Sequence, residues 1–155
     1  MPLSRFDLRC LVFAVVLGAV GCGGSDNTSP TTTPSQTLAT DILRGTVPPP
    51  VDDALQSAFG TFAVAQGGGS VSVTLTSAVE TLPGGSLLTT ITMGIGIGTV
   101  TNGACVLLAN AFTTAQAGSS PQLSGTLAAG TYCIQVSDVS SQLGPVAFAV
   151  AVSHP

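Results

Sequence analysis

The sequence offers very little charge to a partner. It has no tryptophan and, since its three basic residues are Arg5, Arg9 and Arg44, no lysine. Charged residues make up 6% of the 155 residues, whereas about a quarter is usual in soluble domains. Because nucleic-acid binding depends on basic side chains that neutralise phosphates, this scarcity excludes a nucleic-acid partner.

Groups for acid–base or nucleophilic chemistry are equally scarce. The one histidine, His154, is next to Pro155, and we expect it to end the last strand in solvent rather than to act as a base. After Phe59 the only acids are Glu80 and Asp138, which we expect to be solubilising surface residues. We therefore predict no catalytic residue, no bound metal and no cofactor, and we interpret the protein as non-enzymatic.

The string GIGIG at residues 94–98 has a spacing seen in nucleotide-binding loops. It lies within a strand pattern and precedes no helix, so the context that a nucleotide site needs is missing. We expect these glycines to allow close packing or a bulge instead.

The N-terminal segment has the pattern of an export signal. Arg5 and Arg9 form a short cationic region, and the eleven residues Cys10–Val20 are predominantly apolar. This stretch is too short for a bilayer, which needs about 20 apolar residues, and it is typical of a secretory signal. We assign residues 1–21 to a signal peptide.

The end of that segment, Ala19-Val20-Gly21-Cys22, resembles the lipobox of bacterial lipoproteins, although that family prefers leucine where Ala19 stands. The resemblance implies that Cys22 is acylated and becomes the N-terminus, since several acyl chains anchor a protein stably. Ordinary cleavage after Gly21, which would leave Cys22 as a free thiol, is the alternative. Gly23 differs from the aspartate that retains some lipoproteins in the inner membrane. We therefore expect an anchored protein of the bacterial cell envelope, at the outer membrane on its periplasmic or surface face.

Residues 22–37 follow as a tether. From Gly23 on they lack large apolar side chains and contain Pro30 and Pro34, which is typical of a linker. Extended at roughly 3.1 Å per residue, such a linker reaches about 45 Å and can hold a domain off a membrane. We expect the folded domain to occupy residues 38–155.

From Leu38 on, apolar and polar residues alternate with a period of two, which is the pattern of strands with one buried face. Turn signals such as Asn102-Gly103 separate the runs. Evenly spaced short strands without a convincing helix predict an all-β fold, an antiparallel β-sandwich. We expect about eight strands, near residues 41–47, 59–65, 70–78, 87–99, 104–109, 122–128, 131–138 and 145–153. The connection at 48–57 has room for a helical turn.

Two segments repeat a short pattern. Residues 43–47 (LRGTV) match residues 123–127 (LSGTL), and each is followed by Gly-Thr-aromatic-x-aliphatic, at 60–64 and 130–134. Pseudo-symmetry of two sheets and a shared strand–turn pattern explain this equally well. The repeat predicts four inward-facing side chains: Phe62, Val64, Tyr132 and Ile134.

The stretch LxGTLxxGTYxIxVxD at 123–138, with GTFxV at 60–64 and GSVxVxL at 69–75, resembles the bacterial pre-peptidase C-terminal type of β-sandwich. The resemblance covers most of residues 38–153 and implies a jelly-roll-like accessory domain of exported proteins that is not itself catalytic. Some relatives bind calcium or matrix polymers through acidic loops. Acids are sparse here, and only Asp138 stands at a matching strand end.

The cysteines divide into separate roles. Cys10 leaves with the signal and Cys22 is the lipid site, which leaves Cys105 and Cys133 in an exported domain and predicts a disulfide between them. Since Cys133 alternates with inward-facing residues, we expect the bridge on the outer face of one sheet or at a sheet edge, not through the core.

These observations favour a non-enzymatic, membrane-anchored envelope lipoprotein that presents a β-sandwich for a structural or interaction role. An envelope protein or a polysaccharide is the expected partner. The alternative is a carbohydrate- or calcium-binding accessory module. The absence of tryptophan, with Tyr132 assigned to the core, argues against sugar binding; an exposed aromatic strip or three clustered oxygen ligands would favour it.

Overall fold

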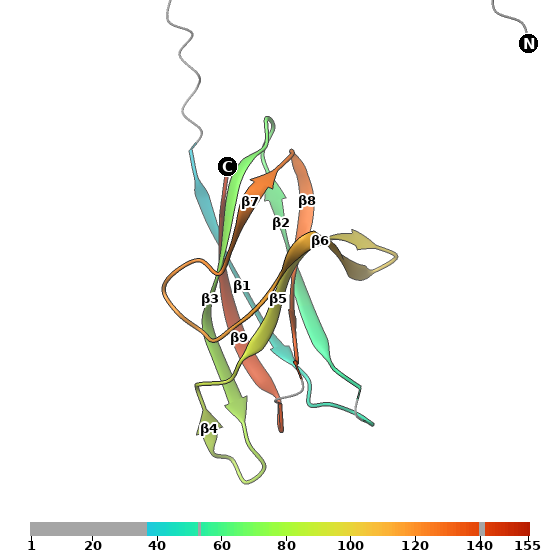
Figure 1. Ribbon diagram of the computed structural model, residues 1–155, viewed down its shortest axis with the longest axis vertical. Coiled ribbons are helices and arrows are strands. Elements are labelled where there is room, and N and C mark those ends of the chain that lie inside the picture. The colour runs from blue at the N-terminus through green and yellow to red at the C-terminus, as the bar shows by residue number, and fades with distance from the viewer. Residues whose placement is uncertain (1–36, 53, 140–141) are drawn as a thin grey trace, which may run out of the picture. The chain divides into compact units, whose positions relative to one another are not determined.

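A computed structural model describes residues 37–52, 54–139 and 142–155, which form two antiparallel β-sheets packed face to face (Figure 1). The described residues contain no helix. The predicted antiparallel β-sandwich is therefore confirmed.

Nine strands make up the two sheets. They are β1 (Ala39–Val47), β2 (Ser57–Val64), β3 (Gly69–Thr81), β4 (Leu87–Leu88), β5 (Met93–Thr101), β6 (Ala104–Ala115), β7 (Leu123–Leu127), β8 (Gly130–Ser137) and β9 (Val146–His154). Two differ from the prediction: the single strand expected at 87–99 is divided into β4 and β5, and β6 continues well beyond residue 109.

The strand order is that of a jelly roll. One sheet has the order β1-β9-β3-β4, with β7 pairing with another part of β3, and the other has the order β2-β8-β5-β6. β7 and the two-residue β4 pair with opposite ends of β3, at residues 69–73 and 80–81. Apart from β4, the sheets are thus β1-β9-β3-β7 and β2-β8-β5-β6, the pairing of two four-stranded Greek-key sheets.

The apolar positions of the alternating patterns meet between the two sheets. Burial of this aliphatic surface is the main stabilising contribution to such a fold. Three of the four side chains predicted to face inward are buried, and Tyr132 packs against the same cluster. The largest fully buried apolar side chains are Val47, Val71, Val73, Leu75, Met93, Ile95, Ile134, Val136, Val146, Val150 and Val152.

The connection at 48–57 contains no helical turn among its described residues, so that expectation is wrong. Its backbone instead forms an isolated bridge between Val51 and Ala54, in which the Ala54 N–H donates to the Val51 carbonyl at 2.9 Å. Three consecutive prolines at 48–50 precede it, and proline has no N–H group with which to continue a helix.

The turn predicted at Asn102-Gly103 is a two-residue hairpin loop between β5 and β6. Thr101 pairs with Ala104, and the two loop residues have φ angles of 52° and 78°. Positive φ at both positions is what a type I′ turn requires, and asparagine followed by glycine is its preferred sequence.

A bulge explains why β6 is longer than predicted. Gly96 of β5 pairs with Phe112, whereas Gly98, two residues further on, pairs with Leu107. The extra residues of β6 between those partners include Leu108 and Ala111, which pack against the core. The bulge interrupts the period-two alternation, so the sequence pattern alone ends the strand too early.

The repeated segments occupy equivalent places in the fold. Residues 43–47 and 123–127 lie in β1 and β7, which are both in the five-stranded sheet. After each segment the chain crosses to the four-stranded sheet, where β2 and β8 are antiparallel neighbours and Phe62 pairs with Tyr132. The repeat therefore marks two similar crossings between the sheets.

Candidate functional site

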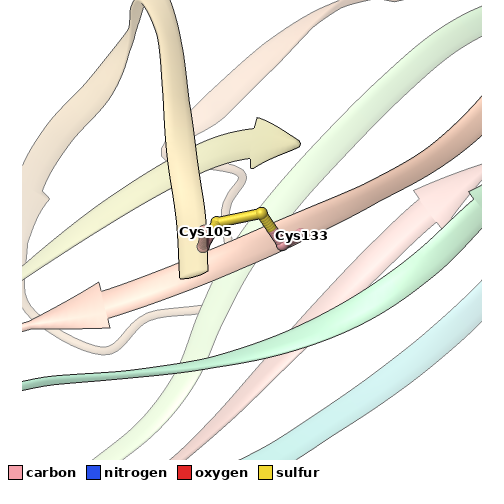
Figure 2. Close-up of a disulfide and its surroundings, with 2 residues drawn as sticks. All are labelled: Cys105 and Cys133. Carbon is pink, nitrogen blue, oxygen red and sulfur yellow. A yellow bond between two sulfur atoms is a disulfide. The ribbon is translucent and has the colours of Figure 1, made fainter. Parts of the chain in front are cut away.

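The predicted disulfide joins Cys105, at the start of β6, to Cys133 in β8, with Cα atoms 5.9 Å apart (Figure 2). β5 lies between these strands in the sheet order, so the bridge spans β5. Cys133 alternates with Tyr132 and Ile134, which belong to the core, so the bridge lies on the opposite face, as expected. Cys133 is nevertheless 0% exposed, since the start of β6 crosses over this part of β8.

Glycine occupies each outward-facing position in the centre of β5, at Gly94, Gly96 and Gly98. A methyl group added at Gly98 would stand 2.4 Å from the carbonyl oxygen of Val106. One added at Gly96 would stand 2.6 Å from a side-chain carbon of Leu107. Because the glycines have no side chain, β6 packs directly onto the backbone of β5.

The Phe112 ring fills the space that a side chain at Gly94 would need. A methyl group at Gly94 would stand 2.8 Å from the ring Cζ atom and 2.5 Å from the Ser137 hydroxyl oxygen. The ring therefore lies against the β5 backbone, while 46% of Phe112 remains exposed to solvent.

Strand register places a second phenylalanine on this face. Phe59 of β2 pairs with Gln135 of β8, Gln135 pairs with Gly96 of β5, and Gly96 pairs with Phe112. Paired residues of antiparallel strands face the same side, so Phe59, which is 42% exposed, shares the outer face with Phe112. At about 4.8 Å per strand, their backbone positions lie roughly 14 Å apart.

A depression adjoins this row and extends from the start of β2 to Phe112. It is open to solvent and encloses about 420 Å³. Its lining combines apolar and hydrogen-bonding groups: Leu55, Gln56, Ser57, Phe112, Gln135, Ser137, Asp138 and Val139. We call the surface made by Ser57, Phe59, Phe112, Gln135 and Ser137 the aromatic face.

A second depression, of about 370 Å³, lies on the outer face of the five-stranded sheet. Five of its eight lining residues are serine or threonine, and none is aromatic: Leu38, Ser70, Val71, Ser72, Ser124, Gly125, Thr126 and Ser153.

Gln135, at the centre of the aromatic face, has an amide that the described residues leave free. The side-chain amides of Gln56, Gln116, Gln122 and Gln142 each donate to a backbone carbonyl. No described residue makes a hydrogen bond with the half-buried Gln135 side chain. A ligand on this face would therefore meet an unoccupied donor and acceptor.

Glu80 and Asp138 are not solubilising surface residues, contrary to expectation. They are 0% and 2% exposed, respectively. Glu80 pairs with the fully buried Val146 and so faces the core. Its Oε1 atom accepts hydrogen bonds from the backbone N–H groups of Leu143 and Gly144, the second at 2.8 Å. These charge-assisted bonds offset part of the cost of removing a carboxylate from water.

Hydrogen bonds of two further residues, Asp138 and Gln142, hold the loop between β8 and β9 in place. Asp138 Oδ1 accepts from the Gln142 backbone N–H at 3.2 Å. The Gln142 side chain donates to the carbonyl oxygens of Val47 at 3.1 Å and Pro48 at 2.6 Å. The two buried acids thus hold a loop in place, through contacts with backbone groups that no side-chain pattern reveals.

His154 is also buried, at 5% exposure, so the prediction that it ends in solvent is wrong. Its strand, β9, lies between β1 and β3 in the sheet, which the sequence pattern does not reveal. Its Nε2 lies 3.1 Å from Asp41 Oδ2, its Nδ1 lies 3.0 Å from the Pro155 carbonyl oxygen, and its ring packs against Phe62.

Within residues 37–52, 54–139 and 142–155, no three His, Cys, Asp or Glu side chains are placed to hold a metal ion. The same part of the chain has no helix that is long and apolar enough to cross a membrane. Cys22, the predicted lipid site, lies outside the described residues, together with the signal and most of the tether.

The aromatic face is not among the sites predicted from the sequence. The alternation of β2 does contain a signal for Phe59, which shares its side of the strand with Thr61 and opposes the inward-facing Phe62. No such signal exists for Phe112, because the bulge before it breaks the alternation of β6.

Comparison with family models and with curated proteins finds no relative of this chain. No protein-family model matches the chain, and no curated protein matches it. The proposals below therefore rest on the residues and their geometry.

Replacing Cys105 and Cys133 together by alanine opens a covalent loop with a sequence separation of 28. In the chain-entropy description, the free energy of unfolding should fall by about 3–4 kcal/mol. Urea unfolding measures this. A reductant should destabilise the native protein by the same amount and leave the double variant unchanged; a variant as stable as the oxidised protein would contradict the account.

Gly98→Ala should lower the free energy of unfolding by about 1–3 kcal/mol, because its methyl group collides with the Val106 carbonyl. Gly125→Ala in β7 is the matched control, since nothing lies within 4 Å of the added methyl. Its stability should change by less than about 0.5 kcal/mol. Thermal unfolding compares the two variants, and equal effects would exclude close packing at Gly98.

Glu80→Ala should destabilise the fold by about 2 kcal/mol or more, because it leaves the buried N–H groups of Leu143 and Gly144 without their acceptor. Glu80→Gln keeps an acceptor oxygen and should lose less. Amide hydrogen exchange at Leu143 and Gly144 is the direct measurement. Unchanged exchange rates in Glu80→Ala would show that the carboxylate does not hold this loop.

Proposed function

We propose that this protein is an exported, non-enzymatic lipoprotein of the bacterial cell envelope, at the outer membrane, which is anchored through Cys22 and presents its β-sandwich on a tether. The Cys105–Cys133 disulfide is the observation that carries the proposal. Disulfides persist in oxidising compartments, so this bond supports the export predicted from residues 1–21. With that pair formed and Cys10 removed with the signal, Cys22 is the remaining cysteine of the mature chain.

The non-enzymatic part of the proposal is supported by the contacts of the groups that a hydrolase would need, because these groups bind other parts of the fold. Both ring nitrogens of His154 lie within hydrogen-bonding distance of Asp41 or Pro155, so the ring is committed to the fold. Glu80 directs Oε1 at two backbone N–H groups. General acid–base catalysis needs such groups within reach of a substrate.

The predicted order of anchor, tether and folded domain supports a role in which the protein holds its β-sandwich away from the membrane. A tether of residues 22–37 separates the anchor from a sandwich that the Cys105–Cys133 disulfide cross-links. The domain resembles accessory sandwiches of exported proteins in its strand and turn motifs, and its jelly-roll order fits that resemblance. Its most ligand-like surface is the aromatic face.

Bacteria that express the full chain and are fed an alkyne-tagged palmitate should label the protein. Cys22→Ser should abolish the label and move the protein from the membrane to the soluble exported fraction, because no acyl chain can be attached. Cys10→Ser is the matched control and should keep the label, since residue 10 leaves with the signal. Label retained in Cys22→Ser would contradict the proposal.

A further inference from the structure

We infer that the aromatic face binds an uncharged polysaccharide. The inference rests on the proposed function only for the compartment in which the protein meets its ligand, because binding itself is a property of the sandwich. Its residues, Phe59 and Phe112 with Gln135 and the two serines, come from β2, β6 and β8 and surround the glycine positions of β5.

The charge of the face determines the ligand class. From Phe59 to the end of the sequence the only acidic or basic residues besides His154 are Glu80 and Asp138, and all three are buried. Among the described residues, the aromatic face itself therefore carries no charged side chain, and the Asp138 that lines the adjoining depression is buried. A charged polymer would lose hydration there without gaining a counter-charge. An uncharged ligand avoids that cost.

The two phenylalanines supply the apolar contact. Each leaves nearly half of its surface in solvent, although both are large side chains that gain free energy from burial. The apolar face of a sugar ring is a surface that an aromatic ring can cover, while the sugar hydroxyls remain at the edges. The backbone positions of Phe59 and Phe112 are three strand spacings apart, farther than one sugar ring spans, so we expect a ligand that reaches both residues to be a chain of several sugars.

The polar groups between the rings match the rest of such a ligand. Gln135 presents at the centre of the face an amide that no described residue hydrogen-bonds, and Ser57 and Ser137 line the adjoining depression. A few hydrogen-bonding groups among apolar ones are typical of ligand sites. A purely apolar protein surface docked here would bury the Gln135 amide without a partner, which is unfavourable.

The face is also held in place before any ligand arrives. The disulfide fixes the start of β6 over β8, and the Phe112 ring rests on the backbone at Gly94. A site whose side chains are already positioned loses less conformational entropy on binding. The second depression, on the five-stranded sheet, is lined by no aromatic side chain and so lacks this combination.

The test is affinity electrophoresis of the full-length exported protein, in detergent, through gels that contain a soluble β-glucan, xylan, mannan or starch, with alginate as the charged polymer. At least one neutral polysaccharide should retard the protein, and alginate should not. Phe59→Ala and Phe112→Ala should each weaken retardation about tenfold, and Gln135→Ala should also weaken it. Leu87→Ala, at an exposed apolar position on β4, is the control and should bind normally.

Thermal unfolding of each variant separates loss of binding from loss of folding. The inference is overturned if no neutral polysaccharide retards the protein, if alginate retards it equally, or if the phenylalanine variants bind as the native protein does. It is also overturned if light scattering shows that these variants convert a dimer to a monomer, since the face would then be a self-interface. Cys22→Ser should bind normally, so a failure of lipid anchoring is distinguishable from a failure of this inference.

Discussion

The packing of β6 onto the bare backbone of β5 is the constraint on which this sandwich depends. Glycine at positions 94, 96 and 98 removes every side chain from the outer centre of β5. Leu107, Phe112 and the Val106 backbone occupy the vacated space. The same close approach brings Cys105 over β5 to reach Cys133. One run of alternating glycines thus permits both the covalent closure of the sheet and the seating of an exposed aromatic ring.

Two acids of the domain, Glu80 and Asp138, are buried inside it, whereas Arg44 and Asp52 are exposed. Glu80 and Asp138 bind backbone groups of the β8–β9 loop, and Asp41 contacts the buried His154. Buried acids are compatible with stability when hydrogen-bond donors reach them, as the backbone N–H groups of Leu143 and Gly144 reach Glu80 Oε1. None of the strands β2, β5, β6 and β8 contains a charged residue, so the outer surface of the four-stranded sheet is uncharged, and this property underlies the ligand class we infer.

The sequence was sufficient to predict the features that follow from local periodicity. The sandwich, the inward positions of Phe62 and Ile134, the Asn102-Gly103 turn and the disulfide all depend on alternation, turn chemistry or the number of cysteines. These signals come from neighbouring residues or from the number of cysteines, so a single sequence is enough to find them.

The features that were not predicted depend on which strands become neighbours. His154 is buried because β9 lies between β1 and β3, and Glu80 is buried because the backbone of a loop more than 60 residues away supplies its donors. Phe112 joins Phe59 on one face only through the register of four strands and a bulge. The alternation of side chains does not indicate which strands become neighbours or which backbone groups bind a side chain. The aromatic face is therefore found only in the structure.

The most direct test of the central claim is an NMR titration of the protein with an oligosaccharide of the neutral polysaccharide that it binds. The account predicts chemical-shift changes concentrated at the Phe112 and Phe59 rings, the Gln135 side-chain amide and the Gly94 Hα protons. Nuclear Overhauser contacts between Gly94 and the Phe112 ring should be present before ligand is added. Shift changes confined to the outer face of the five-stranded sheet, or absent altogether, would contradict it.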